Sequence, residues 1–127
     1  MTPRLLVTGS RDWEDSLTVG RELYRWWEST GCDRDALLVH GGARGLDQMA
    51  AGIWMGQGLI VEVYTAEWER WGKRAGYIRN AEMVNAGADA CLAFIRNGSR
   101  GATMCASLAS QAGIPTRILS QDDPALP

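Results

Sequence analysis

Histidine and lysine are almost absent from this 127-residue chain, which contains one of each. The single histidine, His40, excludes a metal site built from several histidines and a catalytic triad that uses another histidine. The three cysteines, Cys32, Cys91 and Cys105, are scattered and odd in number, which matches neither a disulfide framework nor paired zinc ligands. We therefore expect no metal centre and no cofactor.

Long apolar runs are also missing. None approaches the roughly 18 residues that span a bilayer, and residues 1–13 lack the apolar core of a signal peptide. These absences predict a cytoplasmic protein without a membrane partner. The formal net charge of −2 argues against strong non-specific binding to nucleic acid.

Arginine supplies 12 of the 13 basic residues, and its planar fork suits bidentate recognition of phosphate, although codon bias would produce the same excess.

Short aliphatic segments alternate with longer amphipathic ones, which predicts an α/β fold. The pattern indicates strands at 4–8, 36–40, 60–64, 90–95 and 116–119, and helices at 16–29, 46–57, 76–85 and 102–111. The stretch 65–75 has no clear period and is predicted as a loop or an irregular turn. Because each helix returns the chain to the same end of the sheet, the strands are expected to be parallel. We expect one domain over residues 1–120, followed by a tail at 121–127.

Three glycine-bearing loops follow strands of the predicted sheet. They contain Gly9, Ser10 and Arg11; Gly41, Gly42, Ala43, Arg44 and Gly45; and Asn97, Gly98, Ser99, Arg100 and Gly101. Glycine permits close backbone approach to a ligand, and the unpaired N–H groups of a helix start suit phosphate. A tight turn would explain any one loop alone. Three loops at the carboxyl ends of parallel strands, each with an arginine, favour one shared anion-binding pocket.

Several side chains near these loops are further candidates for ligand binding. Asp47 lies at the start of the helix that follows the second loop, where it either caps the helix or accepts a hydrogen bond from a ribose hydroxyl. Thr103 lies in the first turn after the third loop. Arg79 and Asn80 are adjacent on the helix 76–85, where an isolated pair would be read as a solvated face. His40, at a strand end, is interpreted as structural.

Four segments together resemble the SLOG superfamily, most closely its small stand-alone branch of YspA-like and YpsA-like proteins. They read VTGSRDW, VHGGARGLDQMA, AEW…GKRAGYIRNAEM and AFIRNGSRGATMCASLASQAGIP, and cover about residues 4–119. The resemblance implies a single Rossmann-like, three-layer domain with a mainly parallel five-stranded sheet in the order 3-2-1-4-5. It also implies binding of a nucleotide or nucleotide-derived ligand, related to NAD or ADP-ribose, in stress or phage-defence signalling.

The enzymes that this superfamily contains, the cytokinin-activating phosphoribohydrolases, cleave the N-glycosidic bond of a nucleoside monophosphate. They use an arginine from a motif like that around Arg79 and a glutamate that follows a PGGxGT loop. Here the loop reads NGSRGAT, and Cys105 aligns with the glutamate. Because glycosidic cleavage needs a carboxylate, Asp47 or Glu82 would have to act with Arg79 if the protein were an enzyme.

Three functions therefore stay open. The leading one is a binding module, that is a sensor, carrier or sequestering protein for a nucleotide-type small molecule. A phosphoribohydrolase-like enzyme is the alternative. Single-stranded DNA binding, as in the related DNA-processing protein A, is a second alternative that the acidic balance disfavours.

Trp26, Trp27 and Trp54 give two of the predicted helices more aromatic surface than one-sided packing requires. Together with the dimers formed by the related enzymes, this predicts a homo-oligomer, either a dimer or a larger assembly.

Overall fold

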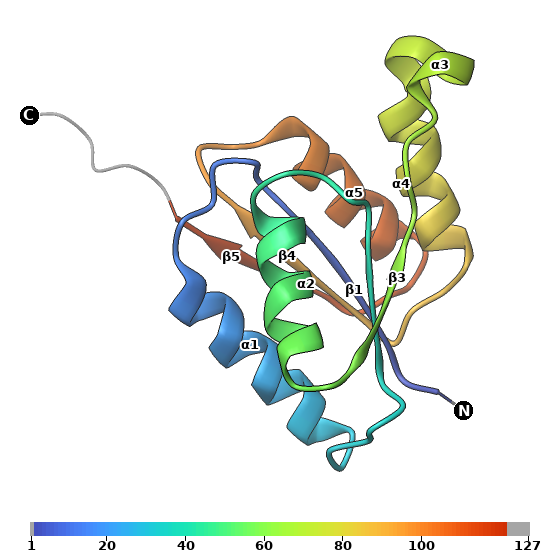
Figure 1. Cartoon of the computed structure of the whole chain (residues 1–127). Helices are drawn as coiled ribbons and strands as arrows, with labels where there is room; N and C mark the ends of the chain where they lie inside the picture. Colours follow the sequence, from blue (N-terminus) through green and yellow to red (C-terminus); the bar gives the residue numbers. More distant parts are fainter. Residues whose placement is uncertain (1, 122–127) are drawn as a thin grey trace, which may run out of the picture.

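A computed structural model describes residues 2–121 of the chain as a single parallel sheet between two layers of helices. The strands are β1 (Arg4–Gly9), β2 (Leu37–His40), β3 (Ile60–Val63), β4 (Ala90–Ile95) and β5 (Thr116–Ser120). All four strand pairings are parallel, and the order is β3-β2-β1-β4-β5 (Figure 1). The expected α/β class and the strand order that the resemblance implies are both confirmed.

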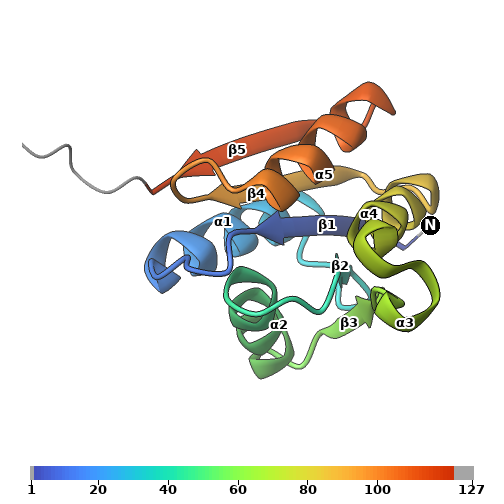
Figure 2. The same cartoon turned by 90° about the horizontal axis from the view of Figure 1, so that it is seen from above.

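The helices lie on both faces of the sheet. They are α1 (Ser16–Ser29), α2 (Leu46–Gly56), α3 (Trp68–Trp71), α4 (Ala75–Asn85) and α5 (Arg100–Gln111), with the short 3₁₀ turn η1 (Gly72–Arg74) before α4. Helices α1 and α2 cover one face, and α4 and α5 cover the other (Figure 2). The three-layer arrangement follows from right-handed crossovers that leave β1 and β4 in opposite directions.

The central strand β1 contributes side chains to both halves of the core, because successive side chains of a strand point to opposite faces of the sheet. Leu5 and Val7 pack with side chains of α1 and α2, in the cluster that includes Trp54. Leu6 faces the other way and packs with Met83 of α4 and with α5. A strand buried on both faces reads as a continuous apolar run, which explains the unbroken LLV sequence.

The segment 65–75 differs from its sequence-based expectation. Instead of a loop throughout, it contains α3 and η1, and α4 already begins at Ala75. One helical turn of four residues is too short to display a 3.6-residue period, so the pattern gives no sign of it. Helix α5 likewise begins at Arg100, two residues earlier than expected, with Ser99 at its N-cap.

The expected tail begins with Gln121, whose N–H donates to the carbonyl oxygen of Ile95 at 3.0 Å and so continues the pairing with β4. The remainder of that tail, residues 122–127, lies outside the described residues. Among the residues described, no helix has the length and apolar character needed to cross a membrane.

Candidate functional site

A hollow of about 450 Å³ opens at the carboxyl ends of β1 and β4. Its walls come from the loop after β1, the loop after β2, helix α4, and the loop that leads from β4 into α5. The lining residues are Thr8, Gly9, Arg11, Asp12, Ala43, Arg79, Asn80, Arg96, Asn97, Ser99, Gly101 and Ala102. We call this hollow the switch-point cavity, because β1 and β4 are the neighbouring strands from which the chain leaves to opposite faces of the sheet.

Ser10 joins the two loops that flank the cavity. The backbone N–H of Arg96 donates to the Ser10 hydroxyl oxygen at 2.7 Å, and the backbone N–H of Ser10 donates to the carbonyl oxygen of Phe94 at 2.9 Å. Ser10 is almost fully buried, so its hydroxyl group connects the loops below the cavity surface. The floor of the cavity is therefore held in place before any ligand arrives.

Three guanidinium groups line the cavity, each from a different segment. Arg79 donates from Nε to Asn80 Oδ1 at 2.8 Å and from a terminal nitrogen to the carbonyl oxygen of Gly41. Arg96 donates to the carbonyl oxygen of Asp12 at 2.7 Å and lies 3.2 Å from a carboxylate oxygen of Glu14. Both side chains are thus oriented by the protein itself.

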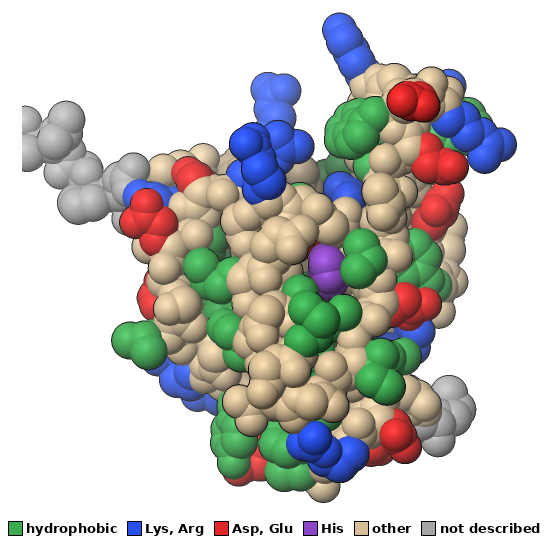
Figure 3. Space-filling model, in the orientation of Figure 1, with side chains coloured by type: hydrophobic (Ala, Val, Ile, Leu, Met, Phe, Trp, Pro, Cys, Tyr) green, Lys and Arg blue, Asp and Glu red, His purple; other side chains and the backbone are tan. Residues whose placement is uncertain are grey.

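Arg11 is different, since it is exposed and forms no ion pair or side-chain hydrogen bond within residues 2–121. Figure 3 shows several Lys and Arg side chains along the top of the molecule, where the strands end, together with Asp and Glu side chains beside them.

The backbone N–H groups of the loop after β2 are hydrogen-bonded to side chains of the protein itself. Asp47 Oδ2 accepts from the N–H of Gly41 at 3.1 Å and from the N–H of Ala43 at 3.2 Å. The N–H of Gly42 donates to His40 Nδ1 at 3.0 Å. These three successive amides are therefore occupied. The amide donors that face the cavity come instead from the first turn of α5, where Gly101 and Ala102 lack partners within the helix.

Asp47 is a buried carboxylate below this loop, only 4% exposed. Burial raises its pKa to about 6, against the lowering effects of the two amide donors and of the Arg79 guanidinium. Its second oxygen, Oδ1, is buried without a hydrogen-bond partner in the described part of the chain. Burial and the nearby Arg79 guanidinium also lower the pKa of His40, so its Nδ1 stays unprotonated and can accept from Gly42.

The raised pKa of Asp47 predicts a specific pH dependence of folding. In the unfolded chain the pKa is near 3.8, so between about pH 4 and 6 the folded state retains a proton that the unfolded state has released. The contribution of Asp47 to stability is therefore largest below pH 4 and is lost as the pH rises through 6. We expect the free energy of unfolding of wild type, relative to Asp47→Asn, to fall by about 2 kcal/mol between pH 4 and pH 7.5 in urea titrations.

Asparagine is the suitable replacement in that experiment because its carbonyl oxygen can still accept from Gly41 and Ala43. Glu82→Gln, which neutralises an exposed carboxyl of α4, serves as the control and should track wild type across the pH range. A constant difference between wild type and Asp47→Asn at every pH would contradict the assignment.

The structure brings many of the sequence-derived candidates together and leaves others apart. Those that line the switch-point cavity are Gly9, Arg11, Ala43, Arg79, Asn80, Asn97, Ser99 and Gly101. Those outside the lining are Ser10, Gly41, Gly42, Arg44, Gly45, Asp47, Glu82, Gly98, Arg100 and Thr103. Sequence reasoning missed Thr8, Asp12, Arg96 and Ala102. Arg96 had a usable signal, since it directly follows a strand whose carboxyl end was expected at the pocket.

The position that aligns with the glutamate of the phosphoribohydrolases carries no reactive group. Cys105 is fully buried beneath the sheet, and burial raises the pKa of its thiol to about 11. Glu82 is exposed on α4 and does not line the cavity, and Asp47 lies under the second loop. Asp12 is the single carboxylate among the described residues of the lining.

Residues 3–71 match the family described as the YspA, cpYpsA-related SLOG family. The chain is 44% identical over 121 residues to the Gene 61 protein of Mycobacterium phage D29, an alignment that covers 88% of this chain and 92% of the phage protein. No solved structure matches the chain.

Proposed function

Because the chain belongs to the YspA, cpYpsA-related SLOG family, we propose that it binds a nucleotide-type ligand in the switch-point cavity. The observation that carries the proposal is the meeting of Arg11, Arg79 and Arg96 around a hollow of about 450 Å³. Three guanidinium groups in so small a space favour an anion with several oxygens. The amides in the first turn of α5, which lack partners within the helix, add further hydrogen-bond donors for such an anion.

The composition of the lining favours the sugar and phosphate parts of such a ligand. Among its described residues there is no aromatic ring, and the purely aliphatic side chains are those of Ala43 and Ala102. A base needs an apolar or stacking surface, whereas hydroxyl and phosphate oxygens need donors and acceptors. Asp12, Asn80 and Asn97 supply acceptors for sugar hydroxyl groups, so we assign a ribosyl phosphate to the cavity and place the base at its mouth.

Binding without turnover suits this lining better than hydrolysis does. Glycosidic cleavage needs a carboxylate that stabilises an oxocarbenium-like centre or activates water, and among the described residues of the lining Asp12 is the single carboxylate. The protein would then act as a sensor, carrier or sequestering module, for example in signalling by NAD- or ADP-ribose-related nucleotides during phage infection. The phage protein at 44% identity is compatible with that setting.

The proposal predicts that the phosphate, rather than the base, decides binding. In calorimetry and thermal-shift measurements at constant ionic strength, ribose 5-phosphate, AMP and ADP-ribose should bind, and adenosine should not. A ligand at 100 times its dissociation constant adds about 2.7 kcal/mol of stability, which corresponds to roughly 10 °C in melting temperature for a domain of this size.

Equal stabilisation by adenosine and AMP would contradict this assignment, as would the failure of every phosphorylated compound to bind. Chromatography of the same incubations tests turnover. Release of free base from AMP or ADP-ribose by wild type, but not by Arg79→Ala, would show that the protein is a hydrolase and not a binding module.

A further inference from the structure

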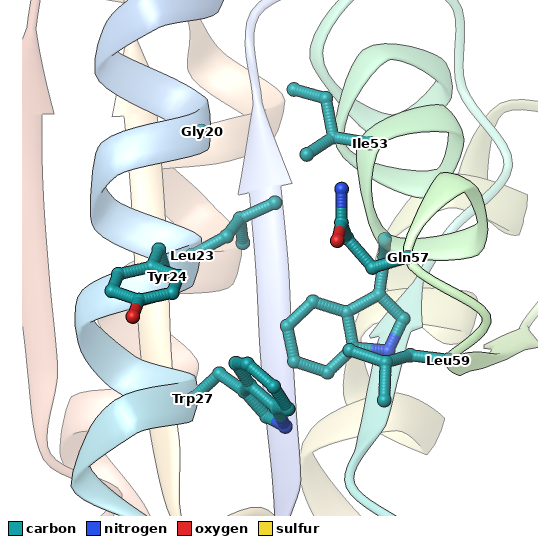
Figure 4. Close-up of a pocket in the computed structure, with 8 residues that line it drawn as sticks. Gly20, Leu23, Tyr24, Trp27, Ile53, Gln57 and Leu59 are labelled. Carbon is teal, nitrogen blue, oxygen red and sulfur yellow. The ribbon is translucent and has the colours of Figure 1, made fainter. Parts of the chain in front are cut away.

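Helices α1 and α2 lie side by side and together present one face to solvent (Figure 1). A groove of about 310 Å³ runs between them, lined by Gly20, Leu23, Tyr24, Trp27, Ile53, Trp54, Gln57 and Leu59 (Figure 4). Beside the groove, the outward stripe of α1 consists of Leu17, Arg21, Tyr24 and Glu28, all exposed. We call the groove and this stripe the α1–α2 face.

The two indole rings of the groove are fixed with their polar atoms already satisfied. Trp27 Nε1 donates to the carbonyl oxygen of Asp33 at 2.8 Å, and Trp54 Nε1 donates to that of Ile60 at 2.9 Å. Figure 4 shows the Trp27 ring between the two helices, with Leu23 and Ile53 above it. What the groove offers a partner is therefore apolar surface of fixed shape.

The face exposes more apolar surface than packing within one chain explains. Leu17 is 84% exposed and Tyr24 57%. Helix α1 contains Gly20, and helix α2 contains Gly52 and Gly56; a methyl group at any of these positions would meet nothing within 4 Å. Glycine inside a helix is less favourable than alanine, and here the single chain gives no steric reason for it.

Charge reaches the groove from Arg34, whose guanidinium lies 5.9 Å from the centre of the Trp27 ring and donates to the carbonyl oxygen of Gln57 at 2.9 Å. The two helices themselves carry few charges on the face, and those of α1 complement each other. Helix α2 carries one charged residue, Asp47, which is buried. On the outward stripe of α1, Arg21 and Glu28 lie seven residues apart, about 10 Å along the helix, with Tyr24 between them. Glu28 forms no ion pair within residues 2–121, and Arg21 approaches Glu22 only at 3.9 Å.

We propose that the α1–α2 face binds a second copy of this chain about a two-fold axis near Tyr24. Antiparallel packing of the two α1 helices places Arg21 of each copy opposite Glu28 of the other, because the axis lies midway between these positions. The two ion pairs form symmetrically, and each Tyr24 ring reaches the mouth of the opposite groove. An isologous contact of this kind closes at two copies.

The extent of the face sets the strength of the dimer. Helices of 14 and 11 residues are about 21 and 17 Å long, which gives a contact at the small end of the range for specific interfaces. We therefore expect a dissociation constant in the micromolar range. The contact is on the side of α1 and α2, away from the lining of the switch-point cavity, so it does not depend on the proposed function.

A charge-swap series tests the proposal by sedimentation equilibrium on the full chain. Arg21→Glu and Glu28→Arg should each weaken dimerisation about tenfold or more, because each turns two attractive pairs into two repulsive ones. The double variant Arg21→Glu/Glu28→Arg should regain most of the lost affinity. Glu69→Arg on α3 is the matched control, with the same charge change as Glu28→Arg at an exposed position off the face.

Melting temperatures first establish that every variant is folded. A wild type that stays monomeric at several hundred micromolar overturns the proposal. A dimer that neither single change weakens, or a double variant no better than the singles, also overturns it, and the face would then belong to a different partner.

Discussion

Replacing Gly45 by alanine will destabilise the domain by about 3 kcal/mol or more. Gly45 precedes α2 with φ +75° and ψ −120°, a backbone conformation that is accessible to glycine and strained for other residues. A methyl group there would also collide with the backbone of Arg11, including its carbonyl carbon and oxygen. Backbone of a neighbouring loop cannot rotate away as a side chain can, so overpacking adds to the conformational strain.

The effect should appear as a lower midpoint in urea unfolding with an unchanged slope. Gly76→Ala is the matched control, since its new methyl group would meet only Trp68 at 3.6 Å, an ordinary contact, in the first turn of α4. That variant should be neutral or more stable by up to about 1 kcal/mol. If Gly45→Ala unfolds at the same urea concentration as Gly76→Ala, the close contact between the first and second loops is incorrect.

The fold was largely predictable because it depends on periodicity and connection rules. The LLV run of β1 and the alternation of strands with helices determine parallel pairing without knowledge of any tertiary contact. The short helices within 65–75 could not be predicted, because periodicity gives no information about them. Helix α3 and the turn η1 together span only seven residues, and Gly72, the first residue of η1, breaks the helical conformation between them with φ +58°. No periodic signal survives over so short a distance.

The candidate site was predictable at the level of loops but not of individual side chains. Strand order determines which loops meet, whereas the direction of a side chain in a loop depends on neighbours that the sequence does not identify. Arg44 lies in a glycine-bearing loop and Arg100 directly after one, and these loops meet at the cavity, yet both arginines are exposed and outside its lining. Arg96 was overlooked, although Asp12 and Ser10 orient it from the neighbouring loop.

Asp47 illustrates the same limit of sequence patterns. Its place at a helix start allowed two roles, a helix cap or an acceptor from ribose. The structure shows a third arrangement, in which its carboxylate accepts from the amides of Gly41 and Ala43 and closes the second loop upon itself. Hydrogen bonds from a side chain to a preceding loop depend on the fold of that loop, and spacing alone does not reveal them.

Replacing Arg79 by methionine should abolish most ligand affinity, with a loss of about 100-fold for ribose 5-phosphate or AMP. Methionine retains much of the aliphatic length but removes the fork that faces the cavity and the charge-assisted hydrogen bonds it would give to phosphate oxygens. It also removes the donor to the carbonyl oxygen of Gly41, which holds the second loop against α4. Calorimetric titration of folded protein measures the loss directly.

Comparison with the arginines outside the lining makes the experiment decisive. Arg44→Ala and Arg100→Ala remove the same charge near the carboxyl ends of the strands. If only the long-range electrostatic field attracted the ligand, these two variants and Arg79→Met would lose the same ligand affinity. Direct contact predicts instead that these two variants lose less than about threefold and that Arg11→Ala loses about tenfold. If Arg44→Ala weakens binding as much as Arg79→Met does, the ligand lies above the loops rather than between Arg79 and Arg96, and the switch-point cavity is not its binding site.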